Sequence, residues 1–111
     1  MNQTLVKQCV AEFIGTFALI FVGVGVIANH SGLNGNAGLL PVALAHGLTI
    51  AVMVSATGTI SGGHLNPAVT FGPAIISGQW DHHYVYWVGP LIGGALAGLV
   101  YGRFLIKTDP Q

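Results

Sequence analysis

The stretch of sequence that decides the fold is residues 58–77, GTISGGHLNPAVTFGPAIIS. Its first part, residues 58–65, combines three glycines with small polar residues, which is too irregular for a membrane-spanning helix. Asn66 and Pro67 then form a helix start, because Asn caps free N–H groups and Pro suits the first helical turn. The sequence therefore predicts an irregular loop followed by a short apolar helix that ends near Ser77.

The sequence around this stretch carries almost no charge. Only 5% of its 111 residues are charged, against roughly 25% in a typical globular protein. Residues 13–80 contain no Asp, Glu, Lys or Arg at all. A soluble protein this small must cover its surface with polar groups, whereas a bilayer protein need not. We therefore expect an integral membrane protein whose partner is the lipid bilayer, in the plasma (inner) membrane.

Three apolar segments are long enough to cross a bilayer, because a spanning helix needs about 20 residues. They cover about residues 5–28, 37–57 and 84–105. The helix after Asn66 is only about 16 Å long at 1.5 Å per residue, so it crosses half of a hydrocarbon core of about 30 Å. Irregular backbone at that depth requires a wet cavity or a protein environment. The predicted fold is all-α, with three transmembrane helices and a re-entrant half-helix over residues 58–77.

Two features of the last segment indicate how it packs. Gly94 and Gly98 form a small-xxx-small pair that lets another helix approach closely. Aromatic residues cluster at the start of the segment and suit the headgroup boundary: Trp80, Tyr84, Tyr86 and Trp87.

Several function classes find no support in the sequence. The formal net charge is zero, so no basic patch points to nucleic acid as a partner. Cys9 is the only cysteine, and no second ligand stands at metal spacing from His64. No nucleophile–base pair or phosphate-binding loop is evident. We expect no enzyme activity, no metal and no cofactor.

The ten residues Ser61-Gly62-Gly63-His64-Leu65-Asn66-Pro67-Ala68-Val69-Thr70 resemble, almost letter for letter, the signature of the aquaporin, or major intrinsic protein, family. Residues 11–17 (AEFIGTF) resemble the first helix of this family of water and glycerol channels, and residues 42–48 (VALAHGL) its second. Family members are about twice as long and carry two inverted repeats, each with its own Asn-Pro-Ala.

The second part of the chain departs from the family order. Residues 71–74 (FGPA) and 87–94 (WVGPLIGG) resemble the residues after the family's second motif and those of its sixth helix. Since the third and sixth helices are equivalent in the two repeats, the resemblance implies one complete aquaporin-like repeat over residues 1–111. The two parts would join near residues 69–71.

The resemblance assigns pore roles to the motif and to the residues before it. A half-helix that starts at mid-membrane directs its unpaired N–H groups and partial positive charge into the pore. Asn66, within Asn66-Pro67-Ala68, adds a side-chain donor for water, while cations meet a positive barrier. The backbone carbonyls of residues 62–64 would form a ladder of acceptors: Gly62, Gly63 and His64.

The resemblance also places a selectivity filter. His46 matches a filter position on the second helix, and Val54 replaces the other helical filter residue. Val69 stands where the family has its filter arginine after the second motif. With Gly63, these residues imply a wider and more apolar filter than one that passes only water.

Glu12 lies inside the first apolar segment, where a carboxylate is normally a candidate for proton coupling. In the family, the equivalent carboxylate accepts hydrogen bonds from the loop that carries the motif. The resemblance therefore implies a structural role for Glu12, and a small proton-coupled exporter that uses it is a less favoured alternative.

A single repeat supplies only half of a pore wall, and the family's two halves are inverted. The flanking positive charges are Lys7 at one end and Arg103 and Lys107 at the other, a weak bias that allows both orientations. We therefore expect an antiparallel homo-oligomer that forms a passive channel for water or small neutral solutes such as glycerol. The alternative is a non-conducting, deletion-derived or accessory subunit of a full-length channel.

Overall fold

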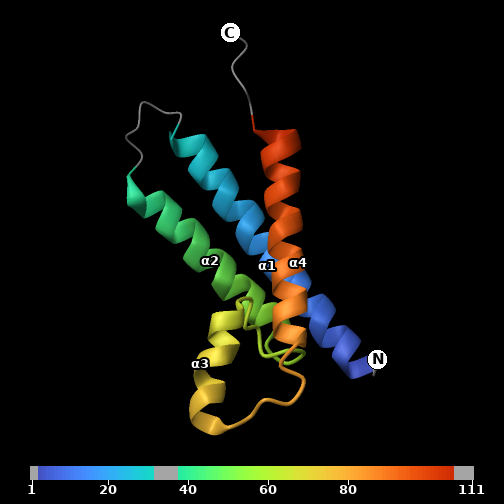
Figure 1. Cartoon of the computed structure of the whole chain (residues 1–111). Helices are drawn as coiled ribbons and strands as arrows, with labels where there is room; N and C mark the ends of the chain where they lie inside the picture. The colour runs from blue at the N-terminus through green and yellow to red at the C-terminus, as the bar shows by residue number, and fades with distance from the viewer. Residues whose placement is uncertain (1–2, 32–37, 107–111) are drawn as a thin grey trace.

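The computed structural model describes residues 3–31 and 38–106, apart from the side chains of His30 and Ser31. Within these ranges all regular structure is helical, which confirms the predicted all-α class (Figure 1). The elements in chain order are α1 (Gln3–Ser31), α2 (Leu39–Thr57), α3 (Pro67–Ser77), α4 (Val85–Val100) and the π-helix η1 (Tyr101–Leu105).

Three of the described helices are long and apolar enough to cross a membrane: Gln3–Asn29, Leu39–Thr57 and Val85–Leu105. The first is longer at both ends than the segment expected from the sequence, 5–28. The last span includes η1. The helix therefore continues beyond α4 as a π-helix, in which each N–H bonds to the carbonyl five residues earlier. The stretch between the first two expected spans, residues 29–36, lies largely outside the described residues, and α1 itself runs through Ser31.

Helix α1 is the centre of the molecule, with α2 running beside it and α4 crossing it (Figure 1). Glycines allow the close approach of α4. A Cβ added at Gly89 would lie 2.8 Å from the carbonyl oxygen of Cys9, and one added at Gly93 would collide with the Phe13 carbonyl. Gly94 was expected to form the contact face. A Cβ added there would contact only side chains of α1, those of Thr16 and Ile20, at 3.4 Å. The backbone contact is therefore made by Gly89 and Gly93, five residues before the predicted pair of Gly94 and Gly98.

Burial in the described part of this chain differs from that in a soluble protein. The interior of the described part holds Glu12, Ser61 and Thr70, whereas large apolar side chains cover the outside. No residue of the apolar stretch of α2 is buried apart from its last, Thr57. This distribution is that of a chain whose outer surface meets lipid or another protein.

Helix α3 is short because both of its ends are specified. Asn66 caps its N-terminus by accepting the backbone N–H of Ala68 at 2.8 Å, and Pro67 occupies the first turn. Gly78 ends it in the left-handed region, with φ 72°. In Figure 1, α3 begins beside the end of α2 and leads away from it towards the end of the molecule where α1 starts.

Candidate functional site

The loop between α2 and α3, residues 58–65, has an unusual backbone. It leaves α2 through a turn in which the N–H groups of Ile60 and Ser61 both donate to the Thr57 carbonyl, at 2.9 Å each. Gly62 and Gly63 then take positive φ values of 91° and 63°, which glycine adopts without steric cost. Leu65 also has a positive φ, 60°, which costs energy in a residue with a Cβ unless its surroundings hold it there.

Glu12 holds this loop from α1. Its side chain is fully buried, with 0% exposure. One oxygen, Oε2, accepts the Ser61 hydroxyl at 2.5 Å and the His64 N–H at 3.1 Å, and the other, Oε1, accepts the Leu65 N–H at 2.6 Å. Three donors from one loop thus satisfy a carboxylate that would otherwise be very unfavourable in an apolar interior.

Thr16 completes the support of Leu65. Its hydroxyl donates to the Leu65 carbonyl at 2.9 Å, while the Leu65 side chain packs directly on Gly15. Both peptide groups of this residue are therefore fixed by α1, which explains how it keeps a left-handed backbone. Thr16 stands four residues after Glu12 and so shares its helix face. That spacing was a usable signal for Thr16, which was not among the residues predicted from the sequence.

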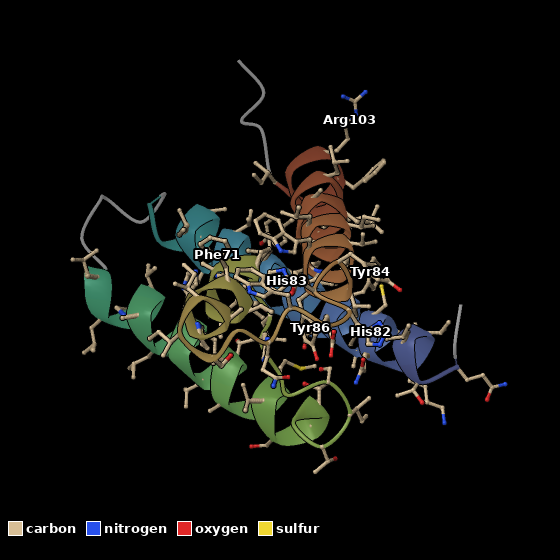
Figure 2. All side chains as sticks on the ribbon, turned by 60° about the horizontal axis from the view of Figure 1, so that its bottom comes forward. Phe71, His82, His83, Tyr84, Tyr86 and Arg103 are labelled. Carbon is tan, nitrogen blue, oxygen red and sulfur yellow. The ribbon has the colours of Figure 1, made fainter. Side chains whose placement is uncertain are left out.

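Tyr86, at the start of α4, holds the loop from the other side. Its hydroxyl donates to the Ser61 carbonyl at 2.6 Å, and its ring stacks on His64 with the centroids 4.4 Å apart. His64 in turn pairs through Nδ1 with the Thr70 hydroxyl of α3 at 2.7 Å. Tyr86, one of the aromatic residues expected at the headgroup boundary, lies half-buried against the loop (Figure 2). We call Glu12, Thr16 and Tyr86 the loop clamp.

Asn66 stands at the edge of an open groove. Because its Oδ1 accepts the Ala68 N–H, its NH2 group points away from the cap as a donor. The adjacent groove has a volume of about 400 Å³ and lies between α1 and α4. Residues 65–67 form one wall, and Thr16, Ile20, Leu91 and Gly94 contribute to the others.

The structure brings only some of the expected filter residues together. Gly63 packs on α2, where an added Cβ would lie 3.1 Å from the Val54 Cα. His46 precedes Val54 by eight residues in α2, about 12 Å along the axis. Its Nδ1 lies 2.7 Å from the Val42 carbonyl, and its Nε2 faces α1, 2.5 Å from where a Gly23 Cβ would be. Val69, in the first turn of α3, is 49% exposed.

His83 belongs to an aromatic cluster rather than to the loop clamp. It accepts the Trp87 indole N–H through Nδ1 at 2.8 Å, and its ring lies 4.9 Å from that of Trp80 and 6.4 Å from that of Phe71. This cluster ties the loop after α3 to the start of α4 (Figure 2). Within the described part of the chain, no three His, Cys, Asp or Glu residues are grouped to hold a metal ion.

Comparison with known proteins identifies the chain's family. The Major intrinsic protein family model matches it in two pieces, residues 1–72 and 70–101. Aquaporin TIP2-1 of Arabidopsis thaliana is 45% identical over 104 residues, which cover 94% of this chain and 40% of that relative. Probable aquaporin TIP4-1 of Oryza sativa subsp. japonica is 47% identical over 104 residues, with 92% and 39% covered. The chain spans about two fifths of the length of these relatives. By its family match and these identities, it belongs to the major intrinsic protein family.

Proposed function

We propose that this protein is a passive transmembrane channel for water or small neutral solutes such as glycerol. The observation that carries the proposal is the placement of Asn66, whose free NH2 group faces an open groove at the start of α3. The first N–H groups of α3 add a partial positive charge at the same point. A neutral polar solute can give its oxygen to these donors, whereas a cation is repelled there.

The loop before Asn66 supplies acceptors in the proposed pathway. The carbonyls of Ser61 and Leu65 are engaged by Tyr86 and Thr16. Between them, the carbonyls of residues 62–64 accept no hydrogen bond from any described residue. Three free carbonyls next to a free amide offer a solute successive hydrogen-bond partners. These bonds replace the ones that the solute loses to bulk water when it enters. The loop clamp keeps this row of acceptors in one conformation.

We propose that a second copy, inserted in the opposite direction, completes the pore. The groove beside Asn66 is open, and the apolar stretch of α2 is unburied in the described structure. The two family matches meet at residues 70–72, which supports one aquaporin-like repeat over 1–111 joined near 69–71. Lys7 and Arg103 mark the two ends of the described spans, and this weak charge difference permits both orientations.

Liposome permeability tests the channel directly. Purified protein is reconstituted, and stopped-flow light scattering follows shrinkage in sucrose and re-swelling in glycerol. We expect permeability well above that of empty liposomes, and a loss of this gain in Asn66→Ala. Gln79→Ala, an exposed amide in the loop after α3, is the control and should conduct like the wild type. Equal permeability of protein-containing and empty liposomes would overturn the proposal.

Fixed orientation tests the antiparallel pairing. One variant carries extra lysines before residue 3, and another carries them after residue 106, so that each inserts in a single direction. Each variant expressed alone in cells should give no solute flux across the cell membrane, and co-expression of the two should restore it. Full flux from either variant alone would rule out antiparallel pairing while leaving the channel itself intact.

A non-conducting accessory subunit is the second candidate, because the chain spans only about 40% of its relatives. It predicts co-purification with a full-length channel and no flux alone.

The small exporter is less favoured, since three described donors of the loop engage the Glu12 carboxylate. It predicts uphill transport driven by a proton gradient, which a passive pore cannot perform. The plasma (inner) membrane is our proposed location, and a fluorescent fusion imaged in the source cells tests it.

A further inference from the structure

A second groove lies on another side of α1 from the site, between α1 and the end of α2. Its volume is about 590 Å³, and its walls are almost entirely apolar. The side chains that form it include Val6, Val10 and Ile14 of α1, Met53 and Ala56 of α2, and Ile60. It contains neither Asn66 nor any residue of the loop clamp, so the proposed conduction does not use it.

Lys7 stands at the mouth of this groove. Among the described residues it has no hydrogen-bond or ion-pair partner. Of the two acids in the described part, Glu12 is buried with three donors and Asp81 lines a different pocket with His64 and His83. The groove therefore combines apolar walls with one positive charge, that of Lys7, for which the described residues supply no counter-ion.

The depth of Lys7 matches the headgroup region. Gly89 of α4 contacts Cys9 of α1, and both helices start at the same end of the molecule (Figure 1). Lys7 and Trp87 each lie two residues closer to that end, about 3 Å along their axes. Trp87 is 41% exposed and Tyr84 50%, as is typical of aromatic residues at the membrane boundary.

We propose that this groove binds an anionic phospholipid, with the phosphate on the Lys7 ammonium and one acyl chain along Val10, Ile14 and Met53. A lysine near the surface attracts an anionic headgroup, while its methylene stem lies along apolar surface. The groove runs inward from Lys7 to Ile14, about 10 Å at 1.5 Å per residue, along the path that a lipid chain takes from its headgroup.

A lipid fits the groove better than a second copy of the chain. Of the acids in the described part, a second copy could neutralise Lys7 only with its Asp81, because Glu12 is buried. Asp81 precedes the start of α4, so an antiparallel copy would carry it to the opposite end of the molecule (Figure 1). An antiparallel copy would also bring its Arg103, which lies at the far end of the last span, to the side where Lys7 stands (Figure 2). Because Arg103 is positive as well, a copy seated in this groove would not supply the counter-charge that Lys7 lacks.

Native mass spectrometry of the detergent-purified full chain tests the proposal, with phosphatidylglycerol and phosphatidylcholine of the same acyl chains as probes. The wild type should retain phosphatidylglycerol about fivefold better, as expected for one lysine near the headgroup. Lys7→Gln should abolish this preference, and the matched control Arg103→Gln should keep it. Ala56→Phe, which fills the groove, should reduce retention of both lipids.

Three results would overturn the proposal: an unchanged preference in Lys7→Gln, an equal loss in Arg103→Gln, or undiminished retention in Ala56→Phe. Because Lys7 and Arg103 are both exposed, neither substitution disturbs the interior. A fourth result would identify a second copy as the occupant instead. This is a disulfide-linked dimer formed in proteoliposomes by Val10→Cys in a Cys9→Ser background, together with no lipid retention.

Discussion

Glu12 shows how one residue can determine the conformation of a loop far away in the sequence. Its three donors come from residues 61–65, about 50 positions later in the chain. A buried carboxylate is tolerated only if its oxygens accept hydrogen bonds, and bonds to a charged group are among the stronger ones. The loop thus gains a fixed conformation, and the carboxylate gains the partners that a lipid environment cannot supply.

Replacing Glu12 should therefore destabilise the whole chain. Glu12→Gln keeps the shape but puts an NH2 group opposite the loop's own donors. We expect a loss of about 2–4 kcal/mol in the free energy of unfolding, measured by denaturant titration in mixed micelles. Gln3→Glu, at an exposed position in the first turn of the same helix, is the control for a general charge effect and should leave stability nearly unchanged. Equal stability of Glu12→Gln and wild type would contradict the loop clamp.

Tyr86 offers a smaller and more specific change. Tyr86→Phe removes the hydroxyl bonded to the Ser61 carbonyl but keeps the ring that stacks on His64. The cost should be about 1 kcal/mol, with faster hydrogen exchange at the amides of residues 62–65. Tyr84→Phe, where the ring is half exposed and its hydroxyl bonds to no described residue, is the matched control. If both variants exchange alike, Tyr86 does not position the loop.

At the scale of elements, the contact between α1 and α4 rests on glycine at two positions. Gly89 and Gly93 allow the two backbones to touch, whereas Gly98 has open space around it. A small-xxx-small pattern in sequence identifies a helix suited to close packing, but not which of several glycines meets the partner. Gly89, Gly93, Gly94 and Gly98 all fit such a pattern, and only the helix crossing distinguishes them.

Alanine substitutions at these positions should therefore differ. Gly93→Ala forces a methyl group against the Phe13 carbonyl, which must move α4 away from α1 at a cost of about 1–3 kcal/mol. Gly98→Ala meets no atom within 4 Å in the described structure beyond its own helix backbone. It should be neutral or slightly stabilising, because alanine favours the helix. Thermal unfolding in detergent compares the two, and equal midpoints would contradict the observed crossing.

Most of the elements were predictable because their signals are local. The Asn66-Pro67 start and the Gly78 stop of α3 are encoded within a few residues, and the charge-free stretch predicts spanning helices. The positive φ of Leu65 and the position of Tyr86 were not predictable. Both depend on which side chains of α1 and α4 lie opposite the loop, and periodicity carries no information about that. The resemblance to the family implied that Glu12 accepts hydrogen bonds from the loop, but it gave no indication of Thr16.

At the scale of the whole molecule, the described interior is small and mixes polar with apolar residues, whereas the apolar exterior is large. The exterior includes almost all of α2. If two chains form one pore, conduction requires their association in the bilayer. Permeability per protein should then fall when the protein-to-lipid ratio is lowered, since dimers dissociate on dilution. Stopped-flow measurements over about a hundredfold range of ratios test this, and a covalently tandem chain that keeps its permeability on dilution is the control.

The long sequence separation between Glu12 and its donors has a consequence for biogenesis. Synthesis is vectorial, so α1 leaves the ribosome well before residues 61–65 exist. During that interval the carboxylate has none of its loop partners, and an acid inside a spanning helix disfavours release of the helix into lipid. The later arrival of the loop removes this penalty. Stable membrane integration of α1 and closure of the loop on Glu12 are thus one event. Although α1 is synthesised first, it is among the last helices to become stably integrated.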